Sequence, residues 1–314
     1  MAYFFVVAIS FIIVFLITPT IRYIALKFYA IDKTNHRKIH KKIVTKLGGL
    51  AIYLGVLGGL SVISLFDFSF FRVNFSLFFS LLIGITLILM LGIYDDFQGS
   101  SARLKFIIQI IISFMIIKSG FLLENVTIGK FININLGMFS IPITLLWLVG
   151  ITNAINLLDG LDGLASGVVG VTSLFIFIFS LILQDVFVSC VALALFGAIL
   201  AFLRYNFYPA KIFMGDTGSL FLGLSVGCLG VYKPMGSVQN HYFVPVVLLL
   251  FLPILDTVLA IMRRVLRRQN IFTGDSSHIH HYFMKLGFSQ PETVIRFYII
   301  TFILGLFSLF IIIA

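Results

Sequence analysis

Long apolar segments alternate with short polar ones along the whole chain. Each segment is continuous and close to the ~20 residues that a helix needs to cross a bilayer. None shows the alternating pattern of about ten residues that is typical of barrel strands. The pattern predicts an all-α, polytopic membrane protein of about ten transmembrane helices, forming one domain over residues 1–314. We expect these helices near residues 3–19, 47–66, 75–93, 104–121, 138–154, 164–184, 186–203, 218–232, 242–262 and 294–313.

Composition supports this interpretation. Of the 314 residues, 60% are hydrophobic and only 11% are charged, whereas soluble domains carry roughly 25% charged residues. The first apolar segment has no basic residue before it and no small-x-small cleavage site after it, so we expect a retained span rather than a signal peptide. Around Gln184 the link between two spans is so short that they should form a tight antiparallel hairpin.

The basic residues predict the orientation. If the spans alternate in direction, 18 of the 22 Lys and Arg residues lie on the side of the first loop, 20–46, or at adjoining helix ends. Cytoplasmic loops carry this excess. We therefore expect a plasma (inner) membrane protein with both termini outside. The net charge of +10 is then a topology signal and does not indicate nucleic-acid binding.

Most carboxylates fall on the same side as the basic loops. Carboxylates near a membrane are energetically expensive and usually serve a function. We therefore expect the active site on the cytoplasmic face. The acidic residues concerned are Asp95, Asp96, Asp159, Asp162, Asp216 and Asp275, with Asp256 inside the ninth span.

Two motifs suggest a divalent cation. Asp95 and Asp96 end the third span, where the helix dipole disfavours anions, so a cation would offset their charge; the alternative is a polar pair that marks the end of the span. Asp159 and Asp162 are spaced to share a face of a helical turn, and Asn156 could add an amide oxygen. Such oxygen ligands suit Mg²⁺, although a Gly-rich turn with side-chain caps would have the same sequence.

Asp216 precedes the eighth apolar segment within Phe213-Met214-Gly215-Asp216-Thr217-Gly218-Ser219. It could be the N-cap of that helix. It could equally bind the metal, next to a helix N-terminus that attracts phosphate. The sequence leaves both interpretations open.

Histidines form two further groups. His278, His280 and His281 lie near Arg267 and Arg268 and favour an anion site, because imidazoles can donate hydrogen bonds to diphosphate oxygens. A zinc site is the alternative, but no thiol accompanies these histidines. The stretch His36–Lys42 includes Arg37 and His40. It is either a membrane-surface anchor or a contact for the phosphate of a lipid substrate.

Taken in order, these motifs resemble the polyprenyl-phosphate N-acetylhexosamine-1-phosphate transferase family (glycosyltransferase family 4). The matching stretches are Tyr94-Asp95-Asp96, the 153–165 segment, Asn206 to Ser219, and His278-Ile279-His280-His281. The last one resembles the branch that primes cell-surface polymers. Ile43 and Thr45 depart from the family, which usually has prolines before the Gly-Gly pair, and this puts the geometry of the first loop in doubt.

The resemblance implies transfer of N-acetylhexosamine-1-phosphate from a UDP-N-acetylhexosamine to undecaprenyl phosphate, with release of UMP. GlcNAc is the expected sugar and Mg²⁺ the expected cofactor, with Mn²⁺ as the alternative. Membrane lipid is a partner, and whether the protein is a homodimer is left open. The implied catalytic residues are Asp95, Asp96, Asp159, Asp162, His280 and His281. The implied metal ligands are Asp96, Asn156 and Asp216. The implied substrate contacts are Asn156, Gly163, Asn206, Phe213, Lys105, His278, Arg37 and His40.

Three other functions compete with this one. A phospho-MurNAc-pentapeptide transferase would be expected to carry three consecutive histidines. A CDP-alcohol phosphotransferase would have Ala-Arg soon after the second aspartate, where this chain has Ser166-Gly167. A secondary transporter predicts polar residues near the bilayer midplane, whereas the predicted spans are almost free of charge.

Overall fold

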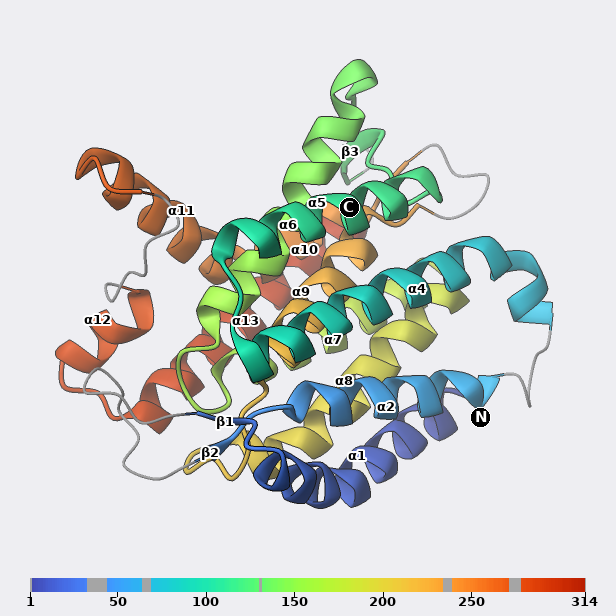
Figure 1. Ribbon diagram of the computed structural model, residues 1–314. Helices are drawn as coiled ribbons and strands as arrows, with labels where there is room; N and C mark the ends of the chain where they lie inside the picture. The colour runs from blue at the N-terminus through green and yellow to red at the C-terminus, as the bar shows by residue number, and fades with distance from the viewer. Residues whose placement is uncertain are drawn as a thin grey trace.

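The computed structural model describes residues 2–32, 44–63, 69–129, 132–233, 239–270 and 278–313, with the side chains of 32 and 69–75 left out. Helices make up most of it (Figure 1). The first half contains α1 (Ala2–Lys27), β1 (Ile31–Asp32), β2 (Val44–Thr45), α2 (Gly48–Ser61), α4 (Ser69–Gln98), α5 (Ala102–Lys118), β3 (Asn125–Ile128), β4 (Ile132–Asn135), η1 (Gly137–Phe139) and α6 (Ser140–Leu158). The second half contains α7 (Leu164–Ile182), α8 (Val186–Asn206), α9 (Gly215–Val231), α10 (Phe243–Leu249), α11 (Phe251–Leu266), α12 (Ile279–Lys285) and α13 (Gln290–Ile313).

Every predicted apolar segment coincides with helix, but the ninth is broken. It forms α10 and α11, which meet at a 72° bend. Among the described residues, six helices are long and apolar enough to cross a membrane, or seven if the bent pair counts as one span. α2 and α9 are apolar but shorter. At 1.5 Å per residue the 14 residues of α2 reach only about 21 Å. The chain is therefore a multi-pass helical protein, and the ten-span count stays a prediction.

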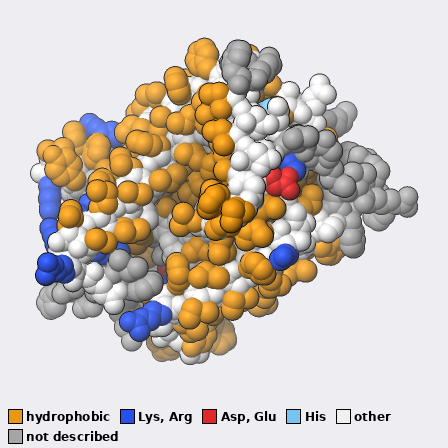
Figure 2. Space-filling model, turned by 90° about the horizontal axis from the view of Figure 1, so that it is seen from above, with side chains coloured by type: hydrophobic (Ala, Val, Ile, Leu, Met, Phe, Trp, Pro, Cys, Tyr) orange, Lys and Arg blue, Asp and Glu red, His pale blue; other side chains and the backbone are white. Residues whose placement is uncertain are grey.

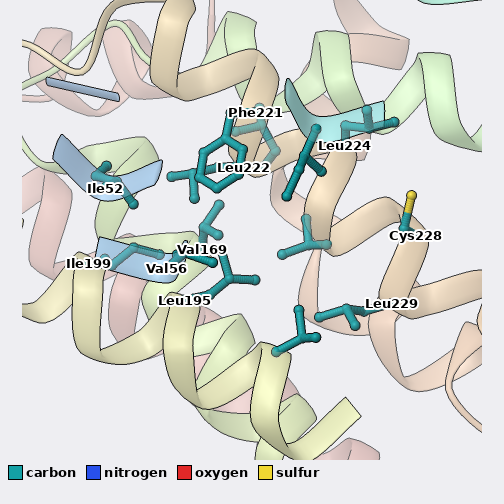
Figure 3. Packing of buried hydrophobic residues seen from close by; sticks show 14 of the residues in the cluster. Ile52, Val56, Val169, Leu195, Ile199, Phe221, Leu222, Leu224, Cys228 and Leu229 are labelled. Atoms are coloured by element: carbon teal, nitrogen blue, oxygen red, sulfur yellow. The ribbon is translucent and has the colours of Figure 1, made fainter. Parts of the chain in front are cut away.

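The core lies where α2, α7, α8 and α9 pack together. Figure 3 shows Ile52 of α2, Val169 of α7, Leu195 of α8 and Phe221 of α9 pointing toward one another. All four are buried. α7 and α8 form the expected antiparallel hairpin, because only residues 183–185 separate them.

Two small antiparallel sheets supplement the helices, which the all-α prediction did not include. β1 pairs with β2, with Ile31 opposite Thr45. β3 pairs with β4 over four residue pairs, from Asn125 opposite Asn135 to Ile128 opposite Ile132.

Hydrophobic and basic side chains occupy different parts of the surface. On the face shown in Figure 2, hydrophobic side chains cover most of the molecule, and most of the visible Lys and Arg side chains gather at the left. The same end of Figure 1 holds α11 and α12. Motif residues lie at the ends of α4 and α6 and at the beginnings of α5, α7 and α9. The motifs therefore meet at one end of the bundle.

Candidate functional site

Asp96, near the end of α4, caps the start of α9. Its carboxylate accepts hydrogen bonds from the backbone N–H groups of Asp216 (3.1 Å) and Thr217 (3.0 Å) and from the Thr217 hydroxyl (2.7 Å). These donors are among those that a helix start leaves without an intrahelical partner. Asp96 is buried. The side chain of Asp216 therefore does not act as the N-cap, which was one of the two interpretations that the sequence left open.

A glycine makes this contact between α4 and α9 feasible. A Cβ atom added to Gly92, one turn before Asp96, would lie 2.5 Å from the carbonyl oxygen of Asp216. Side chains of any other residue would force the two helices apart. The close approach is what brings a carboxylate from α4 to the first turn of α9.

Asp216 is the centre of a polar cluster from three helices. One carboxylate oxygen accepts a hydrogen bond from Lys105 of α5 at 2.8 Å, and the other accepts one from the amide of Asn156 of α6 at 3.0 Å. The same amide donates to the Ser219 hydroxyl at 2.8 Å. The predicted metal ligands Asp96, Asn156 and Asp216 therefore lie in contact.

Lys105 also links Asp216 to Asp95. Its ammonium lies 3.3 Å from the Asp95 carboxylate. Asp95 in turn accepts a hydrogen bond from the backbone N–H of Ser100 at 2.8 Å and from its hydroxyl, and so closes the turn between α4 and α5. Lys105, predicted only as a substrate contact, is thus the cation that lies between two carboxylates of the site.

Asp159 lies at the C-terminal end of α6, close to the same carboxylates. Burial, together with the charges of Asp216, Asp96 and Asp162, raises the pKa of Asp159 to about 8. Burial makes the larger contribution, and the neighbouring carboxylates add to it because like charges disfavour the ionised form. A cation bound at this end of the bundle would offset those charges.

The segment 159–163 is a turn between α6 and α7, so the prediction that Asp159 and Asp162 share a helical face is wrong. Gly163 has a φ of 79°, which ends the helical path. Asp162 points instead to the segment after α8, where it accepts a hydrogen bond from the backbone N–H of Ala210 at 2.9 Å. Asn206 joins the same region, because the Ser166 hydroxyl donates to its side-chain oxygen at 2.7 Å.

Phe213 is held by backbone hydrogen bonds to the end of the first loop and to the start of α2. Its N–H donates to the carbonyl of Thr45 at 2.8 Å, and its own carbonyl accepts from Gly48 at 3.0 Å. Lys46 lies between Thr45 and Gly48 in the chain, and its ammonium is 3.7 Å from the Asp96 carboxylate. The described part of the first loop therefore reaches the carboxylate cluster although it lacks the family's prolines.

Asp256 anchors the histidine segment. It accepts hydrogen bonds from the backbone N–H of Ile279 at 2.8 Å and from the ring of His278 at 2.9 Å. The rings of His280 and His281 are 4.3 Å apart. His280 lies against the turn at Gly160, where an added Cβ would be 2.7 Å from its Nε2. The structure thus brings the histidines to the 159–163 turn.

His280 does not contribute a positive charge. Burial, together with the neighbouring His281 and His278, lowers its pKa to about 3. Among the described residues neither of its ring nitrogens has a hydrogen-bond partner. A neutral imidazole in this state can donate one hydrogen bond and accept another.

The side chains of the predicted metal ligands are of the chemical kind that Mg²⁺ accepts. Asp96 and Asn156 each contact Asp216, the former at its backbone N–H and the latter at its carboxylate. In the described ranges, no group of three or more His, Cys, Asp or Glu side chains could hold a metal ion by itself. Mg²⁺ commonly takes one or two carboxylates and completes its shell with water and substrate phosphates.

Sequence reasoning missed two residues of the site. Lys46 contacts Asp96, and its position directly before Leu47-Gly48-Gly49 was the available signal. Asp256 was noted only as an unusual charge within a span, without a role for it. Of the predicted site residues, Arg37 and His40 lie outside the described ranges, as does Asp275.

Comparisons with known proteins agree on one family. The sequence profile described as glycosyl transferase family 4 matches residues 78–233. A Bacillus subtilis relative named "Probable undecaprenyl-phosphate N-acetylglucosaminyl 1-phosphate transferase" is 40% identical over 301 residues, which cover 95% of this chain and 82% of the relative. A Mycolicibacterium smegmatis relative named decaprenyl-phosphate N-acetylglucosaminephosphotransferase is 33% identical, over 92% of this chain and 77% of the relative.

A third relative carries the name of a neighbouring activity. It is the phospho-N-acetylmuramoyl-pentapeptide-transferase of Rubrobacter xylanophilus, which is 32% identical over 81% of this chain and 78% of the relative. All three relatives are named for the transfer of a phosphosugar. The chain belongs to glycosyl transferase family 4, in the group of polyprenyl-phosphate N-acetylhexosamine-1-phosphate transferases.

Proposed function

We propose that the protein transfers N-acetylhexosamine-1-phosphate, with GlcNAc as the expected sugar, from a UDP-sugar to undecaprenyl phosphate. The products are UMP and an undecaprenyl-diphosphate-sugar that serves cell-wall or surface-polysaccharide synthesis. The observation that carries the proposal is the contact of Asp216 with Asp96, Asn156 and Lys105, contributed by four different helices. The names of the Bacillus and Mycolicibacterium relatives support the same substrate class.

The expected chemistry is a displacement at phosphorus. An oxygen of the lipid phosphate attacks the phosphorus that bears the sugar. A new P–O bond forms as the bond to the bridging oxygen breaks, and the electron pair of that bond leaves with UMP. A phosphate monoester has its second pKa near 6, so the attacking group is largely a dianion at neutral pH. The reaction then needs alignment and charge neutralisation more than a general base.

Different residues of this chain would provide the alignment and the charge neutralisation. Asp96, Asn156 and Asp216 would hold Mg²⁺, which when bound would neutralise the donor's pyrophosphate. Lys105 lies against Asp95 and Asp216 and would offset the charge of the lipid phosphate. Asp159, Asp162 and Gly163 would line the nucleotide-sugar pocket, and Phe213 would stack on the uracil. Neutral His280, with His281, would hydrogen-bond to diphosphate or sugar oxygens.

The proposed function also implies a position for the site at the membrane boundary. We infer that all ten apolar segments, including the bent pair α10 and α11, lie in the membrane and that the motif end is cytoplasmic. The positive-inside distribution of Lys and Arg supports this orientation. The isoprenoid tail would then stay in hydrocarbon while its phosphate reaches the carboxylate cluster at the boundary.

The test uses purified protein, undecaprenyl phosphate and Mg²⁺ with UDP-GlcNAc, UDP-GalNAc and UDP-MurNAc-pentapeptide. UMP release and labelled lipid are measured together. We expect both products from a UDP-N-acetylhexosamine. Product from UDP-MurNAc-pentapeptide alone would assign the protein to the neighbouring activity, and no UMP from any donor would refute the proposal.

A further inference from the structure

We propose that Tyr298 of α13 is a positioning residue for the turn 159–163, and that its hydroxyl holds the donor side of the site in place. The inference rests on the proposed function, because it takes Asp159, Asp162 and Gly163 to line the nucleotide-sugar pocket. Tyr298 lies outside every motif that the sequence singles out. It reaches the turn from the last helix of the chain.

The hydroxyl of Tyr298 donates a hydrogen bond to the carbonyl oxygen of Gly163. Gly163 is the N-cap of α7, with a φ of 79°. Its carbonyl also accepts from the backbone N–H of Gly167 at 2.9 Å and from the Ser166 hydroxyl at 3.2 Å. The Tyr298 hydroxyl is the donor that comes from another helix, so it links the turn to α13.

A missing side chain on α7 makes room for the tyrosine ring. A Cβ added to Gly167, one turn after Gly163, would lie 1.9 Å from Cζ of Tyr298 and 2.0 Å from its hydroxyl oxygen. Such distances exclude any larger residue at position 167 unless the ring moves. The ring of Tyr298 therefore packs into the space that the missing side chain of Gly167 leaves.

The bond at Gly163 acts on groups assigned to the donor. Asp162, next in the chain, accepts from Ala210, and Ser166 donates to Asn206, so the turn and the segment 206–212 are tied together. The neighbouring residue Phe297 contacts Phe283 of α12, with ring centroids 5.8 Å apart. Adjacent residues of α13 thus support both the turn and the helix that carries His280.

The primary variant is Tyr298→Phe, which removes the hydroxyl and keeps the ring. We expect the KM for the UDP-sugar to rise about three- to tenfold, the size that the loss of one buried hydrogen bond gives. The KM for undecaprenyl phosphate should stay unchanged, and the melting temperature should fall by no more than a few degrees. Tyr205→Phe is the matched control, because that hydroxyl donates to the carbonyl of Phe15 at 2.9 Å, between α8 and α1. It should leave both KM values unchanged.

Gly167→Ala is the second variant, because it displaces the ring without changing the hydroxyl. It should raise the donor KM, and adding Tyr298→Phe should raise it no further, because neighbouring residues in one interaction couple. UDP-induced thermal stabilisation should weaken in both variants in the absence of any acceptor.

The outcomes separate the two proposals. If the wild type is active and Tyr298→Phe has the donor KM of the wild type, the role of Tyr298 is refuted and the proposed function stands. An equal rise in both KM values, or a loss of activity that follows only the melting temperature, would make Tyr298 a general structural residue and refute the positioning role. A wild type inactive with every UDP-sugar would overturn both.

Discussion

Carboxylates occur at both ends of the helix bundle, but they are arranged in opposite ways. At the motif end, Asp96, Asp159 and Asp216 converge from three helices or their ends, and Lys105 lies among them. At the other end, the described carboxylates Asp185 and Glu124 have local roles. Asp185 caps α8 by accepting from Val188 at 3.0 Å, and Glu124 forms an ion pair with Lys233.

The difference shows that convergence, and not the presence of acidic residues, indicates a site. A single aspartate that caps a helix has a structural role that needs no ligand. Several carboxylates that face one another repel, and their repulsion costs stability unless a cation offsets it. Burial first, and then the charges of Asp216, Asp96 and Asp162, raise the pKa of Asp159 to about 8 at the motif end.

The largest expected effect contrasts two isosteric variants, one at each end. Asp216→Asn should lower kcat/KM about 100- to 1,000-fold, the range seen when one charge-stabilising group is removed from an active site. Asp185→Asn should leave kcat/KM unchanged, because asparagine caps a helix as well as aspartate does. Equal activity of the two variants would contradict the assignment of the site to the motif end.

Asp95→Asn should have the next largest effect. The variant weakens the bonds to Lys105 and Ser100, and we expect turnover to fall about 10- to 100-fold. Because the lipid phosphate is largely ionised near neutral pH, raising the pH from about 6 to about 9 should not restore the rate. Recovery to near wild-type turnover at high pH would show that Asp95 acts as a general base.

Asp256→Asn tests the anchoring of the histidine segment. The variant keeps an acceptor for the Ile279 N–H but loses the charged partner of His278. We expect kcat/KM to fall about tenfold, as for the loss of one charge-assisted hydrogen bond. The measurement is steady-state UMP release, with Asp185→Asn as the control. A fully active variant would show that the histidine segment is held in place without this charge.

The smallest effect is expected at the opposite end. Asp185→Ala removes the cap of α8 and should lower the free energy of unfolding by about 1 kcal/mol. Activity per folded molecule should not change. Thermal unfolding in detergent, together with UMP release at a low temperature, would check both parts. A specific loss of turnover would extend the site to that end.

Continuous apolar runs located the long helices, because such runs leave few alternatives in a membrane, but they did not predict the short helix α12. Nor did they reveal the 72° bend between α10 and α11. Leu249, Leu250 and Phe251 continue the apolar pattern through the break, and the available sign was Pro253, which lies in the first turn of α11. The two short sheets were missed because strands of two to four residues give almost no periodic signal.

The motifs identified which residues to examine, but not how they pair. Asp96 and Thr217 are 121 positions apart, and Lys105 and Asp216 are 111 apart. Which side chain caps α9, and which cation lies between the carboxylates, depends on how α4, α5 and α9 pack. Tyr298 could not be recognised at all, because an aromatic residue in an apolar helix is normally read as a contact with lipid or core.

The most direct test of the central claim is Mn²⁺ binding, measured by electron paramagnetic resonance with UDP-GlcNAc present and no acceptor lipid. The wild type and Asp185→Asn should each bind one ion, and Asp216→Asn should bind it at least about tenfold more weakly, as expected for a lost metal ligand. Identical Mn²⁺ binding by Asp216→Asn and the wild type would contradict the claim that the converging carboxylates hold a divalent ion.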